Sequence, residues 1–198
     1  MITTTSQILR RIRAKGRGQT YISKDFLDFG SRAAVDQALS RLVRKGDLRR
    51  LSRGIYDYPK NNPKLGDLTA SPDAVAKSLA KKTNSHLQVS GAQAANLLGL
   101  STQVPARIVY LTDGNSKRVR IGNQTIEFRH TSPRYMAWAD KTSGMVLQAL
   151  RYLGQKNIDD FVMNKLKLSL SNDDKADLKK SVGNAPGWMR PILTKVAM

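Results

Sequence analysis

The hydrophobic residues near the start of the chain recur at helical spacing and are interrupted by polar turns. A first helix is predicted over residues 5–14, and the glycine-containing segment 15–18 ends it. A short second helix is predicted over residues 24–28, with Ser23 as its N-cap. The apolar positions of the first helix are Ile8, Leu9 and Ile12.

A third helix is predicted over residues 32–45, with Ser31 as its N-cap and Gly46 as its stop. One face is apolar with the spacing of a docked helix, and the opposite face is polar near its start and basic near its end. A helix that lies in the DNA major groove needs this arrangement, because its first turns reach base edges and its later turns reach phosphates. The apolar stripe consists of Val35, Ala38, Leu39, Leu42 and Val43.

Strand-forming residues follow directly, on both sides of a tight turn at Ser52-Arg-Gly54. A basic hairpin after three short helices is the order of elements in a winged helix-turn-helix, which we therefore predict over residues 1–60. A small helical domain with a solvated basic face is the alternative, and some winged helices bind only proteins.

The candidate DNA contacts lie on the second and third predicted helices and on the wing. Gln37 suits an adenine edge and Arg32 a guanine edge. The wing arginines suit the backbone or the minor groove. Asp36 is expected to orient Arg32 or Arg41, or to read a cytosine. The full set is Lys24, Ser31, Arg32, Asp36, Gln37, Ser40, Arg41, Arg44, Arg49, Arg50 and Arg53.

The remaining sequence predicts a polar linker over residues 61–71 and a second, mixed domain over residues 72–198. The fold class is therefore α+β, with a small antiparallel sheet and several helices after the winged helix. Extended segments are predicted at 86–89, 107–112, 118–121 and 125–129, and helices at 73–82, 91–98, 145–153, 158–168, 174–182 and 188–196.

The net charge of +19 favours a polyanionic partner. Residues 1–60 contain 14 Lys and Arg against 5 Asp and Glu, and the longer remainder contains 20 against 10, so charge is densest in the predicted winged helix. A second basic surface is proposed on the hairpin at Lys117, Arg118 and Arg120, with an ordinary solvated edge strand as the alternative.

The sequence offers no evidence of catalysis. It lacks cysteine, and its two histidines, His86 and His130, lack metal-ligand spacing. The pairs 159–160 and 173–174 are neighbouring aspartates that point apart on a helix, and no phosphate-binding glycine loop or nucleophile elbow is present. We therefore expect no enzyme activity, no metal and no cofactor. No apolar run is long enough for a membrane span or signal peptide, so a cytoplasmic protein without a membrane partner is expected.

Four segments resemble a known family: Arg53-Gly-Ile-Tyr56, the run from Val89 to Leu100 that reads VSGAQAANLLGL, the strand from Pro105 to Asp113, and the hairpin end from Ile126 to Thr131. Together they resemble the antitoxins of AbiE-type, or type IV, toxin–antitoxin systems, which serve in abortive infection. The resemblance covers roughly residues 5–150.

The resemblance implies that the winged helix binds double-stranded DNA at repeats in its own promoter and represses the operon. It also implies that the second domain neutralises a cognate nucleotidyltransferase toxin without a stable complex. The first alternative is a stand-alone winged-helix transcriptional regulator with a sensing or dimerising second domain. The second is an RNA-binding or nucleic-acid-modifying protein. A nucleotidyltransferase gene next to this one would favour the antitoxin.

Overall fold

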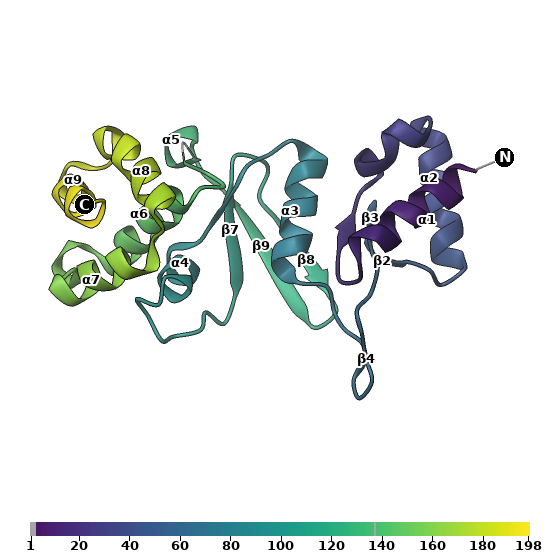
Figure 1. Ribbon diagram of the computed structural model, residues 1–198, viewed down its shortest axis with the longest axis horizontal. Helices are drawn as coiled ribbons and strands as arrows, with labels where there is room; N and C mark the ends of the chain where they lie inside the picture. Colours follow the sequence, from purple (N-terminus) through teal and green to yellow (C-terminus); the bar gives the residue numbers. More distant parts are fainter. Residues whose placement is uncertain (1–2, 137) are drawn as a thin grey trace. The chain divides into compact units, whose positions relative to one another are not determined.

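The structure is a computed structural model that describes residues 3–136 and 138–198 (Figure 1). Its fold is α+β, as the sequence predicts. Two compact units divide the chain: one runs to Ser85 and includes Val119–Ile126, and the other contains His86–Arg118 and Glu127–Met198. In the part of the chain that the structure describes, no helix is both long and apolar enough to cross a membrane.

The first unit begins with the predicted winged helix. Three short strands form an antiparallel sheet in the order β1-β3-β2. The second predicted helix is a 3-10 helix, η1, and it is preceded by the strand β1, which the sequence pattern did not predict. The elements are α1 (Thr4–Lys15), β1 (Thr20–Tyr21), η1 (Ser23–Phe29), α2 (Arg32–Arg44), β2 (Arg49–Ser52) and β3 (Ile55–Asp57).

Local capping explains where these helices begin and end. The Ser31 side chain accepts a hydrogen bond from the backbone N–H of Ala34 and so caps α2, as predicted, and Gly46 follows the helix with a φ of 77°. Ser23 is not the cap of η1, because Ile22 holds that position and its backbone N–H donates to the Asp25 carboxylate at 2.8 Å. The Ser23 hydroxyl is thereby available to a different partner on α2.

The core of the winged helix forms where the apolar stripes of α1 and α2 meet the strands. Burying these side chains contributes roughly 1.5–3 kcal/mol for each large residue, which offsets the conformational entropy of such short elements. The fully buried members include Ile8, Ile12, Phe26, Val35, Leu39 and Leu42.

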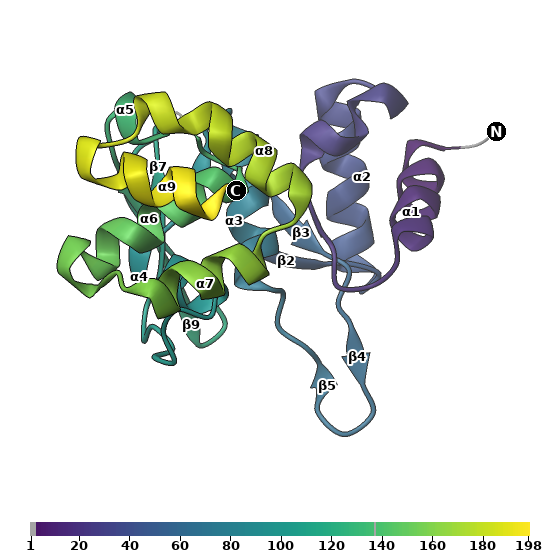
Figure 2. The same cartoon turned by 60° about the vertical axis from the view of Figure 1, so that its left-hand side comes forward.

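The chain between residues 58 and 85 belongs to the first unit, whereas the sequence pattern had placed a linker at 61–71 and assigned the next helix to the second domain. Strands β4 (Asn61–Asn62) and β5 (Gly66–Asp67) form a hairpin here, visible in Figure 2. The Leu68 N–H then donates to the Lys60 carbonyl at 2.8 Å. The hairpin thus brings the chain back to the winged helix, where α3 (Pro72–Thr83) docks.

The second unit combines most of a four-stranded sheet with a group of helices. The strand order is β6-β7-β9-β8, and the buried apolar cluster involves α4 and the helices from α6 to α9. The elements are β6 (Leu87–Val89), α4 (Gly91–Leu97), β7 (Ile108–Thr112), β8 (Lys117–Ile121), β9 (Gln124–His130), α5 (Pro133–Met136), α6 (Thr142–Leu153), α7 (Asp160–Ser169), α8 (Asn172–Ser181) and α9 (Arg190–Val196), with short 3-10 turns between several of the helices.

Candidate nucleic-acid interface

The outward face of α2 presents a row of polar and basic side chains. Val35, Leu39 and Leu42 are buried on the opposite face, and this burial fixes which way the polar face points. In the described residues, the side chains of the outward row form no hydrogen bond or ion pair with the protein, so their donors are free to bind a ligand. These exposed residues are Gln37, Ser40, Arg41 and Arg44.

The first turn of α2 carries an ordered arginine. The Nε atom of Arg32 donates to the Asp36 carboxylate at 2.9 Å, and the second oxygen of that carboxylate accepts from the Ser23 hydroxyl at 2.5 Å. Of the roles considered for Asp36, the structure shows the pairing with Arg32. The Arg32 side chain remains 57% exposed, so its terminal nitrogens can still address a base or a phosphate.

Ser31 and Lys24, two further residues of the predicted site, also have partners within the protein. The Ser31 hydroxyl is the N-cap of α2, and its loss would cost about 1 kcal/mol of stability in a typical helix. The Lys24 ammonium donates to the Asn84 side chain at 2.9 Å and lies 3.4 Å from the Lys81 carbonyl. Each residue therefore contributes to local folding as well as to the basic surface.

The wing arginines differ from one another. Arg50 and Arg53 are exposed, as a DNA contact requires, whereas Arg49 is half-buried and held by partners within the protein. Its guanidinium forms two hydrogen bonds with the Asp57 carboxylate, at 2.6 and 3.1 Å, and a third at 2.7 Å with the Leu68 carbonyl. Arg49 was expected to contact DNA, but the structure places it in an internal ion pair.

The reason lies in the register of the wing. Arg49 stands directly opposite Asp57 in the pairing of β2 with β3, and the Asp57 side chain is only 1% exposed. A carboxylate that is buried away from solvent needs a charged partner with good hydrogen-bond geometry. The hydrogen bond with Asp57 is the main cause that raises the pKa of Arg49 above its ordinary value.

The second predicted basic surface lies along β8. The Arg118 guanidinium is 3.7 Å from the Glu127 carboxylate, and the Arg120 Nε donates to the Gly122 carbonyl at 3.2 Å. The Lys117 ammonium lies over the Phe128 ring, 5.1 Å from its centroid. These contacts order the strand's side chains, and Arg118 and Arg120 stay exposed.

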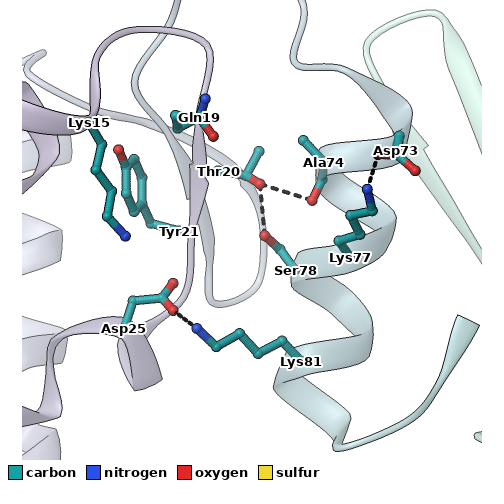
Figure 3. A pocket seen from close by; sticks show the side chains of 10 residues that line it. All are labelled: Lys15, Gln19, Thr20, Tyr21, Asp25, Asp73, Ala74, Lys77, Ser78 and Lys81. Carbon is teal, nitrogen blue, oxygen red and sulfur yellow. Dashed lines mark hydrogen bonds and ion pairs between the residues drawn. The ribbon is translucent and has the colours of Figure 1, made fainter. Parts of the chain in front are cut away.

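A pocket of about 380 Å³ lies between β1, η1 and α3 in the first unit (Figure 3). Its wall is tied together by Thr20, whose hydroxyl is 2.9 Å from the Ala74 carbonyl and 2.7 Å from the Ser78 hydroxyl. The Lys81 ammonium forms an ion pair with Asp25 at one end. Sequence reasoning missed these contacts because they join residues more than 50 positions apart.

Each of the neighbouring aspartate pairs, 159–160 and 173–174, supplies one residue to a helix cap. Asp159 caps α7 through the Val162 N–H at 2.8 Å, and Asp174 forms a capping box with Ser171. The Ser171 hydroxyl is the main cause that lowers the pKa of Asp174. Helix capping accounts for both of these carboxylates.

A histidine–carboxylate pair lies in the second unit. The His86 Nδ1 is 2.7 Å from one Asp113 oxygen, and the His86 backbone N–H donates to the other at 2.8 Å. The side-chain hydrogen bond is the main cause that raises the pKa of His86 and lowers that of Asp113. His86 directly precedes β6 and Asp113 directly follows β7, so the pair joins the chain at the ends of these two antiparallel strands.

The chain thus combines an N-terminal winged helix, with the exposed polar face of α2, and a second α+β unit. Residues 7–178 match the sequence profile of DUF6088, a family of unknown function, and the chain belongs to that family. No curated protein matches it. Among solved structures, the crystal structure of the RV2827C protein from Mycobacterium tuberculosis is similar, with 14% identity, a TM-score of 0.45, and coverage of 97% of this chain and 81% of that one.

Proposed function

We propose that the chain is a DNA-binding antitoxin that represses its own operon and neutralises a nucleotidyltransferase toxin. The observation that carries the DNA-binding half is the outward face of α2, where Gln37, Ser40, Arg41 and Arg44 are exposed without protein partners among the described residues. Such a helix presents hydrogen-bonding groups to base edges and cations to phosphates.

The wing supports the same proposal. Arg50 and Arg53 remain exposed on the hairpin that follows α2 in the chain, and wing arginines of this kind contact the backbone or minor groove. The net charge of +19 supplies the long-range attraction to a polyanion. Taken together, these features fit double-stranded DNA as the partner.

The antitoxin half rests on the family resemblance of residues 5–150. The two functions fit one chain if they use different surfaces, with DNA contacts on α2 and the wing and toxin control on the strand β8. The exposed arginines of β8, Arg118 and Arg120, are the side chains we assign to toxin control. The protein acts in the cytoplasm in this proposal, where promoter and toxin are both present.

DNA binding is tested with the full chain and duplexes selected from a random pool. Arg41→Ala combined with Arg44→Ala should weaken binding, and Lys179→Ala, which removes one charge from an exposed position on α8, is the control. The selected sequence should share a motif, and the genomic promoter of this gene should contain it. Absence of any enriched motif, with equal binding by both variants, would overturn the proposal.

Toxin control is tested by co-expression with the neighbouring gene, scored for growth beside a promoter reporter. Arg50→Ala with Arg53→Ala should abolish repression and keep neutralisation, because Arg49 and its structural ion pair remain. Arg118→Ala with Arg120→Ala should do the reverse. If the wing variant stays folded and loses both functions, toxin control reduces to transcription, and the two-surface proposal is refuted.

A further inference from the structure

The last turn of α3 reaches the turn of the wing. The Lys82 ammonium donates to the Arg53 carbonyl at 2.5 Å. Gly54 follows with a φ of +74°, and a Cβ at that position would lie 3.1 Å from the same ammonium. The Lys82 ammonium therefore lies against the backbone of the wing turn that contains Arg53.

The same turn of α3 also meets η1. Asn84 ends the helix in the left-handed conformation, with a φ of 51°, and its side chain accepts from Lys24. Lys24 follows Ser23, the residue that holds Asp36 beside Arg32. Hydrogen bonds and residues adjacent in the chain therefore connect the first turn of α2, through η1, with the end of α3 and the wing.

The charges along this path are unbalanced. Lys81 is paired with Asp25. In the part of the chain that the structure describes, Lys24, Lys82 and Arg53 have no carboxylate within ion-pair distance. The two lysines donate only to carbonyl and amide oxygens. Each ammonium has three donors and uses only one or two of them here. Cationic donors that have no carboxylate partner in the protein can bind the oxygens of a phosphate.

We propose that Lys24, Lys82 and Arg53 form a phosphate clamp, in which the last turn of α3 is a third element of the DNA interface beside α2 and the wing. The clamp holds the DNA backbone and reads no sequence, because ammonium groups on phosphates carry no base information. The inference rests on the proposed DNA binding. It adds Lys82, in a helix outside the winged helix, to the contacts.

The competing explanation is that these lysines only stabilise the C-terminal end of α3, where cations favour the helix dipole. The two explanations differ in what a neutral donor would do. Lys82→Gln removes the charge and keeps an N–H group for the Arg53 carbonyl. A role confined to the end of α3 leaves the salt dependence of DNA binding unchanged after this substitution, whereas loss of a phosphate contact makes it shallower.

The test measures binding of the full chain to a 30-base-pair duplex of mixed sequence over a series of salt concentrations. For Lys82→Gln, the slope of log K against log salt should become shallower by about 0.9, and affinity at 0.15 M salt should fall about fivefold. Adding Lys24→Gln should double the change in slope and lower affinity about 30-fold in total. The control is Lys77→Gln on the same helix, whose lysine is paired with Asp73 and should leave the slope unchanged.

A positional measurement completes the test, since the chain has no cysteine of its own. An iron chelate attached to Lys82→Cys should cleave the bound duplex, and one attached to Lys77→Cys should cleave it far less. If the unmodified chain binds DNA with a salt-dependent affinity but Lys82→Gln keeps the full slope, or both chelates cleave equally, the clamp is wrong and DNA binding stands. If the unmodified chain shows no salt-dependent binding, the proposed function fails first and the clamp with it.

Discussion

Arg49 and Arg50 are neighbours on the wing, and the structure predicts opposite consequences of replacing them. Arg49→Met leaves the Asp57 carboxylate, which is 1% exposed, without its partner and also removes the hydrogen bond to the Leu68 carbonyl. Breaking a buried ion pair costs roughly 3–5 kcal/mol. Because the Arg49 side chain is 36% exposed, we expect about 3 kcal/mol, the low end of that range. Arg50→Ala should change stability by less than about 0.5 kcal/mol.

The assay is urea unfolding of the full chain, followed by two signals. Both tryptophans, Trp138 and Trp188, lie in the second unit, so their fluorescence reports that unit, whereas far-ultraviolet circular dichroism reports both. Arg49→Met should move part of the dichroism transition to lower urea and leave the fluorescence midpoint in place. Arg50→Ala should leave both midpoints in place.

A double variant separates the ion pair from other effects of the mutation. Arg49→Met with Asp57→Leu removes both charges, and replacing a buried pair by apolar residues is often close to neutral. This variant should recover most of the lost stability. If Arg49→Met unfolds at the same urea concentration as Arg50→Ala, or if the double variant is no more stable than the single one, the reasoning from Asp57 burial is refuted.

Three further outcomes are expected. Gln37→Ala should weaken the free energy of binding by about 1–3 kcal/mol on the selected duplex and by much less on mixed-sequence DNA, whereas Arg44→Ala should weaken binding to both equally. Competition binding measures these losses, and equal losses for Gln37→Ala would mean that Gln37 contacts only the backbone. If about 6 basic residues contact phosphate, log K should fall with log salt at a slope of about −5, and a slope near zero would contradict the interface. The hydrogen bond between His86 and Asp113 raises the pKa of His86 and lowers that of Asp113. The pair therefore stabilises the fold fully between about pH 4 and pH 6.5, and this stabilisation is lost as the pH rises through the raised pKa of His86. The difference in thermal midpoint between the unmodified chain and His86→Gln should accordingly be larger at pH 5.5 than at pH 8.5, and a difference that grows with pH would exclude this pair as its cause.

The local sequence determined most of the elements of the winged helix. Apolar residues at helical spacing bury one face of α2, and this alone fixes Gln37 and Arg44 on the outward face. Ser31 and Gly46 mark its ends because capping depends on residues within one turn. These features could be predicted because their causes lie a few positions apart in the chain.

The role of each arginine on the wing was decided by the tertiary structure. The pairing of β2 with β3 shifts register between Arg50 and Ser52, so that Arg49, and not Arg50, stands opposite Asp57. A one-residue change in register moves a side chain to the other face of a strand, and a bulge of this kind has no signature that hydrophobic alternation reveals. The sequence pattern therefore placed all the wing arginines on the DNA side.

The boundary between the two units was likewise a matter of tertiary structure. A polar segment with glycine and proline resembles a linker, but the β4–β5 hairpin turns the chain back on itself. Helix α3 then docks through Thr20 and Ser78 and through Lys82 at the wing, contacts between residues 29 to 58 positions apart. Amphipathic spacing predicts that α3 buries one face, but the surface it packs against depends on where the folded chain places its partners.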